Sequence, residues 1–337
     1  MSLRRKALQK LNSPLNRLGM RLLSLHEYNS MLATYEGPTI NPPEIPAEAR
    51  RFLDWNNPTL NDLHQRYVGH PASSHSQWSE KALRQSTDLQ NFRGDNHYVY
   101  QTRWSPSAET YALTAFYARD IDRLNLFGQL KEDGLFGAYT QEFEGGYVVS
   151  RDLLDSINQT NVIARLLGCN REDRLDVLDV GAGYGRLAHR VTEGLPQSHV
   201  TCTDAVPLST FISEFYLKFR GVKSAEVIAL DQVEARLPNM RFDIATNFHS
   251  FSECTQQAIK WWLDLLARVD VRKLLIIPNR ADAFLSTETN GDHIDFLPLI
   301  LKSGWKQVYN EPIYAASTVA QALALYPNFR FFLFERE

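Results

Sequence analysis

The sequence has 337 residues, and at roughly 150 residues per domain this length allows about two domains. Apolar residues make up 44% and charged residues 22%, which is the composition of a soluble globular protein and excludes wholesale disorder. The net charge is −3, so the whole chain has no positive field of the kind that holds nucleic acid. The composition predicts a globular protein whose partner is not nucleic acid.

Membrane-spanning, disulfide-rich and zinc-binding classes are also disfavoured. No apolar run approaches the ~20 residues that a membrane-spanning helix needs. The three cysteines are too few and too scattered for a disulfide framework or a zinc site. We expect a cytoplasmic protein, and we assign no metal ligands.

The first 149 residues lack a repeating strand–helix pattern, and we expect them to form a mainly helical substrate or lid domain. Residues 1–24 carry basic but no acidic side chains, with leucines at helical spacing. Such an amphipathic helix can lie on an anionic membrane surface or pack against its own protein. Pro14 interrupts the pattern and favours the second interpretation. A proline-rich connector follows at residues 37–46.

Residues 150–337 show a different pattern. Ser150 can cap a helix that ends at Gly168. From residue 175, short apolar runs alternate with helical segments, which is typical of a parallel sheet covered on both faces. The expected strands are 175–180, 199–203, 227–230, 242–248 and 274–278. The expected helices are 185–194, 207–219, 255–268 and 293–303.

The end of the chain changes pattern again. Residues 305–313 and 329–335 are two more expected strands with no clear helix between them, so one is expected to run antiparallel. Gly145 and Gly146 mark a hinge before the second domain. The predicted fold is therefore α/β: a doubly wound, mostly parallel sheet over residues 150–337, preceded by a mainly helical domain over residues 1–149.

A glycine-rich loop at residues 181–185 is the sharpest signal, because a buried strand there turns directly into a helix. Glycine is needed since the turn is tight and a ligand must approach the backbone closely. The nicotinamide-binding pattern would put its third glycine at 186, which is arginine, and a P-loop would need a following Gly-Lys-Ser/Thr. Here Gly181, Gly183 and Gly185 alternate, with Asp179 two residues before the first.

This arrangement resembles motif I of the class I S-adenosylmethionine-dependent methyltransferases. The resemblance implies a seven-stranded Rossmann-like methyltransferase sheet with an antiparallel C-terminal strand, and S-adenosyl-L-methionine as cofactor. It places Asp204, after the second strand, on the ribose hydroxyls, because a carboxylate can accept from both at once. It places Asp231, after the third strand, on the adenine amine. Asp179 and Asn247 are assigned to the same cofactor site, and Asp204 and Asp231 can alternatively be helix caps.

His249 and Glu253 follow the fourth strand, at the sheet edge that faces the ligand crevice in open parallel sheets. Imidazole titrates near neutrality, so His249 is the first candidate for a general base, with a core histidine as the alternative. If the intervening residues turn as an α-helix, Glu253 lies on the same face. Glu253 can then orient His249, hold a hydroxyl or simply begin the next helix. Asp292 and His293 form a second candidate acid–base or metal-binding group, or Asp292 is a helix cap.

Three stretches are similar to a bacterial group named for sugar O-methylation and associated with surface polysaccharide synthesis. They are residues 92–96, 150–156 and 247–254. The resemblance implies a sugar or glycan hydroxyl as the methyl acceptor. Asp95, Asn96 and His97 are then the residues expected to make polar contacts with the sugar.

The leading hypothesis is an S-adenosylmethionine-dependent O-methyltransferase acting on a hydroxyl of a sugar or surface-glycan precursor. A second hypothesis keeps methyl transfer but takes a lipid or a small hydroxylated metabolite as acceptor, which the basic N-terminal helix favours. A third is a non-catalytic cofactor-binding scaffold, against which the intact glycine loop and Asp204 argue. We assign no oligomeric state.

Overall fold

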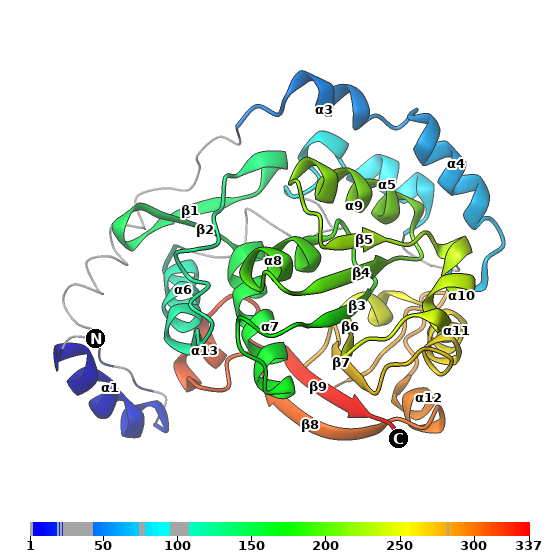
Figure 1. Cartoon of the computed structure of the whole chain (residues 1–337). Coiled ribbons are helices and arrows are strands. Elements are labelled where there is room, and N and C mark those ends of the chain that lie inside the picture. The colour runs from blue at the N-terminus through cyan, green and yellow to red at the C-terminus, as the bar shows by residue number, and fades with distance from the viewer. Residues whose placement is uncertain are drawn as a thin grey trace. The chain divides into compact units, whose positions relative to one another are not determined.

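The computed structural model describes residues 3–18, 20, 22, 43–73, 78–94, 108–281 and 283–337 (Figure 1). The chain divides into two compact units, each of which is described by itself. The first unit consists of Met1–Glu44, Asn91–Asn161 and Pro312–Asn328. The second consists of Ile45–Gln90, Val162–Glu311 and Phe329–Glu337. Each unit is therefore assembled from segments that are far apart in the sequence.

A seven-stranded sheet forms the centre of the second unit, in the order β5-β4-β3-β6-β7-β9-β8. The strands are β3 (Asp176–Val180), β4 (His199–Thr203), β5 (Ala225–Val227), β6 (Ile244–Phe248), β7 (Lys273–Ile277), β8 (Lys306–Pro312) and β9 (Arg330–Glu335). The pairs among β3 to β7 are parallel, and β9 is antiparallel to β7. Helices flank the sheet (Figure 1). This confirms the predicted fold class, a doubly wound, mostly parallel Rossmann-like sheet with an antiparallel C-terminal strand.

The strand order also locates the ligand crevice. β3 lies between β4 and β6, so the chain leaves β3 toward one side for β4 and β5 and returns to the other side for β6 and β7. In open α/β sheets ligands bind outside the carboxyl ends of the strands at this switch point. The glycine loop follows β3 directly, so it lies at this position.

The helices of the second unit include three that begin within one residue of the expected start, α8 (Arg186–Gly194), α9 (Pro207–Phe219) and α11 (Gln256–Leu266). The others of this unit that follow β3 are α10 (Val233–Arg236) and α12 (Leu297–Lys302), with the 3-10 helices η6 (Leu230–Gln232), η7 (Leu237–Asn239) and η8 (Ser250–Glu253). Pro207 is the first residue of α9, where its missing N–H costs nothing. The Thr255 hydroxyl accepts a hydrogen bond from the Ala258 N–H at 3.3 Å and caps α11.

Two expected elements lie elsewhere. The helix expected from residue 293 begins at Leu297. The Asp295 carboxylate accepts the Leu297 N–H at 2.9 Å in the turn just before it. The strand expected at 227–230 ends at Val227. The Leu230 N–H donates to the Tyr67 hydroxyl at 2.7 Å instead of to a neighbouring strand, so the sheet ladder does not continue.

The segment Ile45–Gln90 belongs to the same unit as the sheet, although it lies within the first 149 residues of the sequence. It contains α3 (Ala47–Phe52), α4 (Pro58–Tyr67), η2 (Pro71–Ser73) and α5 (Glu80–Ser86). The Tyr67 hydroxyl hydrogen-bonds the Thr210 hydroxyl of α9 at 2.8 Å. The Phe52 ring stacks on the Phe211 ring with centroids 5.1 Å apart. The segment therefore packs on the elements that follow β4 and β5.

The first unit is mainly helical and contains one hairpin among its described residues. Its elements are α1 (Leu3–Asn16), α6 (Ala108–Ile121), η4 (Leu135–Gly137), β1 (Thr140–Phe143), η5 (Glu144–Gly146), β2 (Tyr147–Ser150), α7 (Arg151–Leu167) and α13 (Thr318–Leu323), with α7 continuing into the second unit and η3 (Leu89–Asn91) spanning the boundary at Gln90. Gly145 and Gly146 have φ of +76° and +78° and form the turn between β1 and β2. The glycine pair expected to be a hinge is therefore a hairpin turn.

Serine side chains cap two helices of the first unit. The Ser150 hydroxyl accepts the Leu153 N–H at 3.1 Å and starts α7, as predicted. A helix that the sequence analysis did not expect, α13, lies between β8 and β9. The Ser317 hydroxyl caps it by accepting the Ala320 N–H at 3.2 Å. A helix as short as α13 contains too few apolar residues for a helical period to be recognised in the sequence.

Candidate functional site

The glycine loop is fixed to the end of β4. The N–H groups of Gly181 and Ala182 both donate to the Thr203 carbonyl, at 2.8 and 3.2 Å. Gly181, Gly183 and Gly185 have φ of +78°, +58° and +83°, a left-handed region that residues with a side chain rarely adopt. The alternation of glycines in the sequence therefore reflects three left-handed positions that alternate along the loop.

The three glycines have different surroundings. A Cβ at Gly181 would lie 2.3 Å from the Ser250 Cβ, so this glycine permits the approach of the turn after β6. A Cβ at Gly185 would lie 3.3 Å from Leu217 of α9, so this glycine permits close helix packing. A Cβ at Gly183 would meet nothing within 4 Å. The space beside Gly183 is therefore open to a ligand.

Asp204 follows β4 and holds the same loop. Its carboxylate accepts the Gly183 N–H at 2.9 Å through Oδ2 and the Val206 N–H at 2.9 Å through Oδ1, and the Ser209 hydroxyl also bonds to it. A carboxylate offers about four acceptor directions, and these three donors use three of them. About one direction therefore remains for a ligand, and a second becomes available if the Ser209 hydroxyl turns away. Burial raises the pKa of Asp204 to about 6. Asp204 is not the helix cap considered as an alternative, because the N-cap residue of α9 is Val206 and no side chain caps this helix. The carboxylate instead ties the glycine loop to the turn before α9 and still has capacity for a ligand donor.

Asp179 is a second buried carboxyl beside the loop. It accepts the Thr246 hydroxyl of β6 at 2.7 Å. Burial raises its pKa to about 6, against the opposing effects of the Thr246 hydrogen bond and the Arg186 charge. Asp179 also contributes by its charge to the raised pKa of Asp204. Two mutually repelling buried carboxyls suit a ligand that brings positive charge and hydroxyl donors.

The Asn247 side chain is used entirely within the fold. Its Nδ2 donates to the Val180 carbonyl at 2.9 Å, and its Oδ1 accepts the Phe251 N–H at 2.9 Å. It is fully buried. Asn247 therefore ties the end of β3 to the turn after β6, and a contact with the cofactor stays a prediction.

Asp231, assigned by resemblance to the adenine amine, lies in η6. Arg66 of α4 donates to both of its oxygens, at 3.0 Å from Nε and 2.6 Å from Nη2. The two side chains are 30% and 33% exposed. The sequence analysis did not find Arg66, because nothing local to it indicates a partner 165 residues away. The adenine contact of Asp231 stays a prediction.

His249 has an unusual backbone conformation. Its φ is +71°, which is rare for a residue with a side chain and is found at tight functional turns. Its N–H donates to the Ile277 carbonyl of β7 at 2.7 Å, and its ring centroid lies 4.6 Å from that of Phe329. His249 therefore ends β6 in a sharply turned position at the carboxyl edge of the sheet.

Glu253 ends η8 and has two neutral donors. The Trp78 indole N–H donates to its Oε2 at 2.7 Å, and the Asn279 amide lies 3.4 Å from its Oε1. Burial raises the pKa of Glu253 to about 7. Trp78 and Asn279 were not identified from the sequence, since Trp78 precedes Glu253 by 175 residues and neither belongs to a motif.

His249 and Glu253 do not share an α-helical face. Residues Ser250–Glu253 form a 3-10 helix, and His249 lies outside it as the N-terminal flanking residue. At about three residues per turn, positions four apart are rotated by about 120°, whereas in an α-helix they are about 40° apart. The spacing argument for a shared hydroxyl therefore does not apply, and the roles of the two residues stay predictions.

The remaining candidates lie in an exposed loop or outside the described residues. Asp292 and His293 are exposed in the loop before α12, and the Asn290 amide donates to the Asp292 carboxylate at 2.7 Å. Asp95, Asn96 and His97 lie outside the described residues. Within the described ranges, no three His, Cys, Asp or Glu side chains are grouped so that they could hold a metal ion. None of the helices searched in those ranges is long and apolar enough to cross a membrane.

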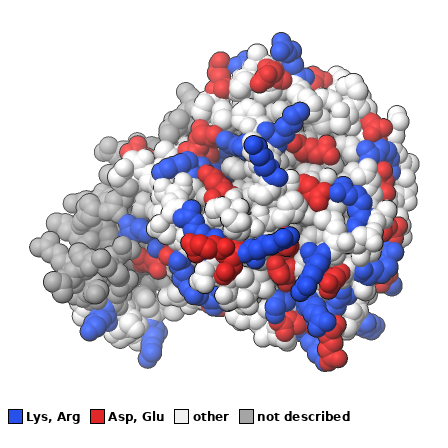
Figure 2. Space-filling view, in the orientation of Figure 1, with Lys and Arg blue, Asp and Glu red and all other residues white. Residues whose placement is uncertain are grey.

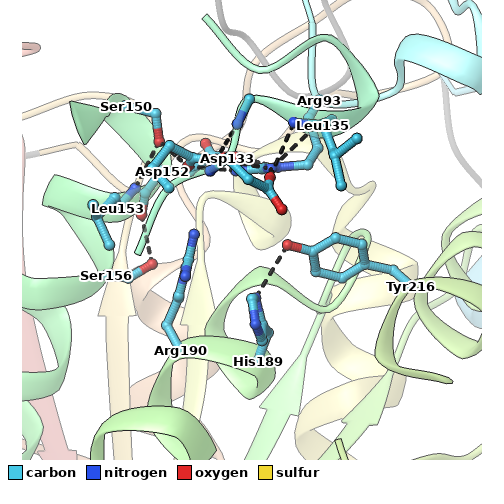
Figure 3. A network of polar contacts seen from close by, with 12 residues as sticks. Arg93, Asp133, Leu135, Ser150, Asp152, Leu153, Ser156, His189, Arg190 and Tyr216 are labelled. Atoms are coloured by element: carbon cyan, nitrogen blue, oxygen red, sulfur yellow. Dashed lines mark hydrogen bonds and ion pairs between the residues drawn. The ribbon is translucent and has the colours of Figure 1, made fainter. Parts of the chain in front are cut away.

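The first unit contains a buried charged cluster, here called the Arg93 cluster: Arg93, Glu132, Ser150 and Asp152 (Figure 3). Arg93 donates to Glu132 at 2.7 Å and lies 3.4 Å from Asp152, and the Ser150 hydroxyl donates to Glu132 at 2.6 Å. The cluster joins two of the stretches that resemble the sugar O-methylating group, residues 92–96 and 150–156. In the second unit, His189 of α8 lies 3.1 Å from the Tyr216 hydroxyl of α9 (Figure 3).

Charged side chains of both signs are interspersed on the face seen in Figure 2. This distribution accords with the net charge of −3. On this face, charges of one sign therefore do not form a separate patch.

Comparisons with known proteins give fold-level similarity only. No family model matches the chain, and no curated protein matches it. Among solved structures, a SAM-dependent methyltransferase from Aquifex aeolicus is 15% identical with a TM-score of 0.38, over 52% of this chain and 88% of that one. The mitomycin 7-O-methyltransferase MmcR is 18% identical with a TM-score of 0.38, over 55% and 57% of the respective chains.

A third similar structure is named for a different reaction. The [4+2]-cyclase SpnF is 16% identical with a TM-score of 0.39, over 56% of this chain and 82% of that one. At these scores the similarities carry no argument about activity, and a fold of this kind hosts more than one chemistry. The function must be argued from the residues of the site.

Proposed function

We propose that this protein is an S-adenosyl-L-methionine-dependent O-methyltransferase that acts on a hydroxyl of a sugar or surface-glycan precursor. One observation carries the proposal: the space beside Gly183 is open, and the Gly183 N–H is held by the buried Asp204 carboxylate. A tight loop with room for a ligand, bordered by buried carboxyls, fits a cationic cofactor that bears a ribose diol. The resemblance of the loop to motif I supports the same cofactor.

Each residue of the cofactor side has a stated task in this proposal. Asp204 accepts a hydrogen bond from the ribose, and Asp179 provides negative charge for a cationic ligand. Gly181, Gly183 and Gly185 keep the loop close to the ligand, and Asn247 holds the loop's strand against the turn after β6. Asp231 is assigned to the adenine side. When bound, the cofactor supplies an electrophilic methyl group on a positively charged sulfur.

The acceptor side lies after β6. A sugar hydroxyl is a weak nucleophile, so a group that accepts its proton is needed, and His249 and Glu253 are the candidates at this edge. Asp95, Asn96 and His97 are proposed to bind the sugar. A lipid or a small hydroxylated metabolite is the alternative acceptor, and residues 1–24 are proposed as a weak contact with a membrane surface. The protein is proposed to act in the cytoplasm.

Calorimetric titration with S-adenosyl-L-methionine tests the cofactor side. A valine at Gly183 fills the open space and should abolish measurable binding. Gly221, at the end of α9, is the matched control, because its φ is +66° and a Cβ there also meets nothing within 4 Å. Gly221→Val imposes the same backbone strain outside the loop and should keep the parental affinity.

Asp204→Ala tests the ribose contact in the same assay, with thermal unfolding measured in parallel to confirm that the variant is folded. We expect a loss of affinity of at least tenfold, about 1.4 kcal/mol, which is the net worth of a hydrogen bond to a charged group. Unchanged affinity in folded Gly183→Val and Asp204→Ala variants would exclude the proposed cofactor site. Labelled cofactor with a panel of nucleotide sugars, lipids and small alcohols then distinguishes the acceptor classes.

A further inference from the structure

The N-terminal segment Ile45–Gln90 reaches the acceptor side of the site. Its Trp78 donates the indole N–H to Glu253 Oε2 at 2.7 Å, within the second unit. Glu253 is also held from another direction. It ends η8, and the hydroxyl of the preceding residue, Ser252, accepts the Asn279 N–H at 3.1 Å. The carboxyl group is thus held between the N-terminal segment and the residues that follow β6 and β7.

The two oxygens of Glu253 differ in their contacts. Oε2 has a short bond to Trp78, whereas the Asn279 amide is 3.4 Å from Oε1, beyond the usual range of a good N–H···O bond. Among the described residues these are the side-chain donors to the carboxyl. Oε1 therefore keeps most of its capacity to accept a proton, while Trp78 fixes the orientation of the group.

The ionisable groups that face Glu253 place it near the cofactor side. Asp204, at the end of β4, contributes by its charge to the raised pKa of Glu253. The second ionisable group is the thiol of Cys254, and the charge of Glu253 raises the pKa of that thiol. Burial is the largest cause of the raised pKa of Glu253, about 7, which is suited to proton transfer near neutrality.

We propose that Glu253 is the proton acceptor of the methyl transfer and that Trp78 is its positioning residue. This inference rests on the proposed function. The acceptor oxygen forms a bond to the methyl carbon as the carbon–sulfur bond breaks, with the bonding pair remaining on sulfur. The hydroxyl proton moves to Glu253 Oε1. The negative charge of the carboxylate and the positive charge of the sulfur are both neutralised, so charge is balanced, and Glu253 afterwards returns the proton to water.

Trp78 has a predictable effect on the proton affinity of Glu253. A donor to a carboxylate favours the ionised form and lowers its pKa. Trp78→Phe keeps an aromatic ring at this position but removes the indole N–H donor, so the pKa of Glu253 should rise. The rate, which needs ionised Glu253, should then reach its plateau at a higher pH than in the parent. A purely structural role of Trp78 would lower the rate without moving this midpoint.

The first test uses the chain without cofactor and reads the tryptophan fluorescence during a pH titration. The parent should show a transition near pH 7, because the Trp78 indole is bonded to the titrating carboxyl. The transition should be absent in Glu253→Gln and in Trp78→Phe. It should persist in Trp55→Phe, the matched control, since Trp55 is a half-buried tryptophan of the same segment whose ring faces the Arg84 guanidinium. Persistence of the transition in Glu253→Gln would overturn the inference.

The second test measures methyl transfer and cofactor affinity together. Glu253→Gln should lower kcat by about 10²–10⁴, the usual loss for a general base, with cofactor affinity within threefold of the parent. Trp78→Phe should shift the rising limb of the pH–rate profile upward. Parental kcat in Glu253→Gln, or an unmoved limb in Trp78→Phe, would overturn this inference alone. Failure of the parent to bind cofactor or transfer methyl to any acceptor in the panel would overturn the proposed function.

Discussion

The two units treat buried carboxyl groups in opposite ways. In the first unit Glu132 and Asp152 are bonded to Arg93, whose side chain is 1% exposed. In the second unit Asp179, Asp204 and Glu253 have hydroxyl, indole, amide and backbone donors, and none has an ion pair with a described residue. Burial raises the pKa of these three groups of the second unit to between about 6 and about 7.

This difference separates a structural cluster from a binding site. A buried carboxylate with a cation in place is electrostatically complete and fixes the fold around it. A buried carboxyl without an ion pair lowers the stability of the folded state at a pH where it is charged. It becomes favourable when a ligand brings positive charge, and it can also serve as a proton acceptor. The Arg93 cluster is therefore expected to act in stability, and the three carboxyls of the second unit in function.

The largest expected effect comes from removing the cation of the Arg93 cluster. Arg93→Met leaves Glu132 and Asp152 buried without it, and we expect the free energy of unfolding to fall by about 3–5 kcal/mol. Arg268→Met, which breaks an exposed pair with Glu234, is the control and should cost less than about 1 kcal/mol. Urea unfolding measures both. Equal, small losses in the two variants would remove the distinction between buried and exposed pairs.

A smaller effect concerns the pH dependence of stability. Because the folded pKa of Asp179 is about 6 and its unfolded value is about 3.9, its contribution to stability is fully present below about pH 4. It is lost as the pH rises through 6. Relative to Asp179→Asn, the parent should therefore lose up to about 1.4 kcal/mol per pH unit within this window.

Asp264→Asn, at an exposed site of α11, controls for the loss of one carboxyl. Unfolding by urea at half-unit pH intervals, without cofactor, gives the comparison. A parent that gains stability over Asp179→Asn as the pH rises from 4 to 7 would show that the carboxyl already has a favourable partner.

The smallest expected effect comes from the pair between Arg66 and Asp231, each about one-third exposed. Arg66→Met should change the free energy of unfolding by about 0–1 kcal/mol, as for other solvent-exposed pairs. It leaves Asp231 in place, so cofactor affinity should change by less than about threefold, which is within the same energy range. A loss of affinity as large as that of Asp204→Ala would instead show that Asp231 needs Arg66 to reach the adenine.

Local patterns in the sequence were sufficient to predict the sheet and the loop, because their causes are local. The glycines at 181, 183 and 185 are needed for alternating left-handed backbone positions, and apolar runs of five residues mark buried strands. α9 was predicted with its observed bounds, since Pro207 starts it and its apolar residues repeat at helical spacing.

The acceptor side was predicted less well, because distant segments assemble it. Trp78 and Arg66 come from a segment that the sequence assigns to another domain, and no local pattern links them to Glu253 or Asp231. A shared face for His249 and Glu253 was conditional on an α-helical turn after β6, but His249 adopts a positive φ and a 3-10 helix follows. Backbone strain of this kind depends on tertiary contacts such as that of the His249 N–H with Ile277.

The central claim is that the buried carboxyls beside the glycine loop bind a cationic, ribose-bearing cofactor. Calorimetric titration with S-adenosyl-L-methionine in two buffers of different ionisation enthalpy, at pH 5.5 and pH 7, tests it directly. If Asp179 and Asp204 have pKa values of about 6 before binding and ionise on binding, more than about one proton is released at pH 5.5 and close to none at pH 7. Absence of binding, or the same proton count at both pH values, would contradict the account.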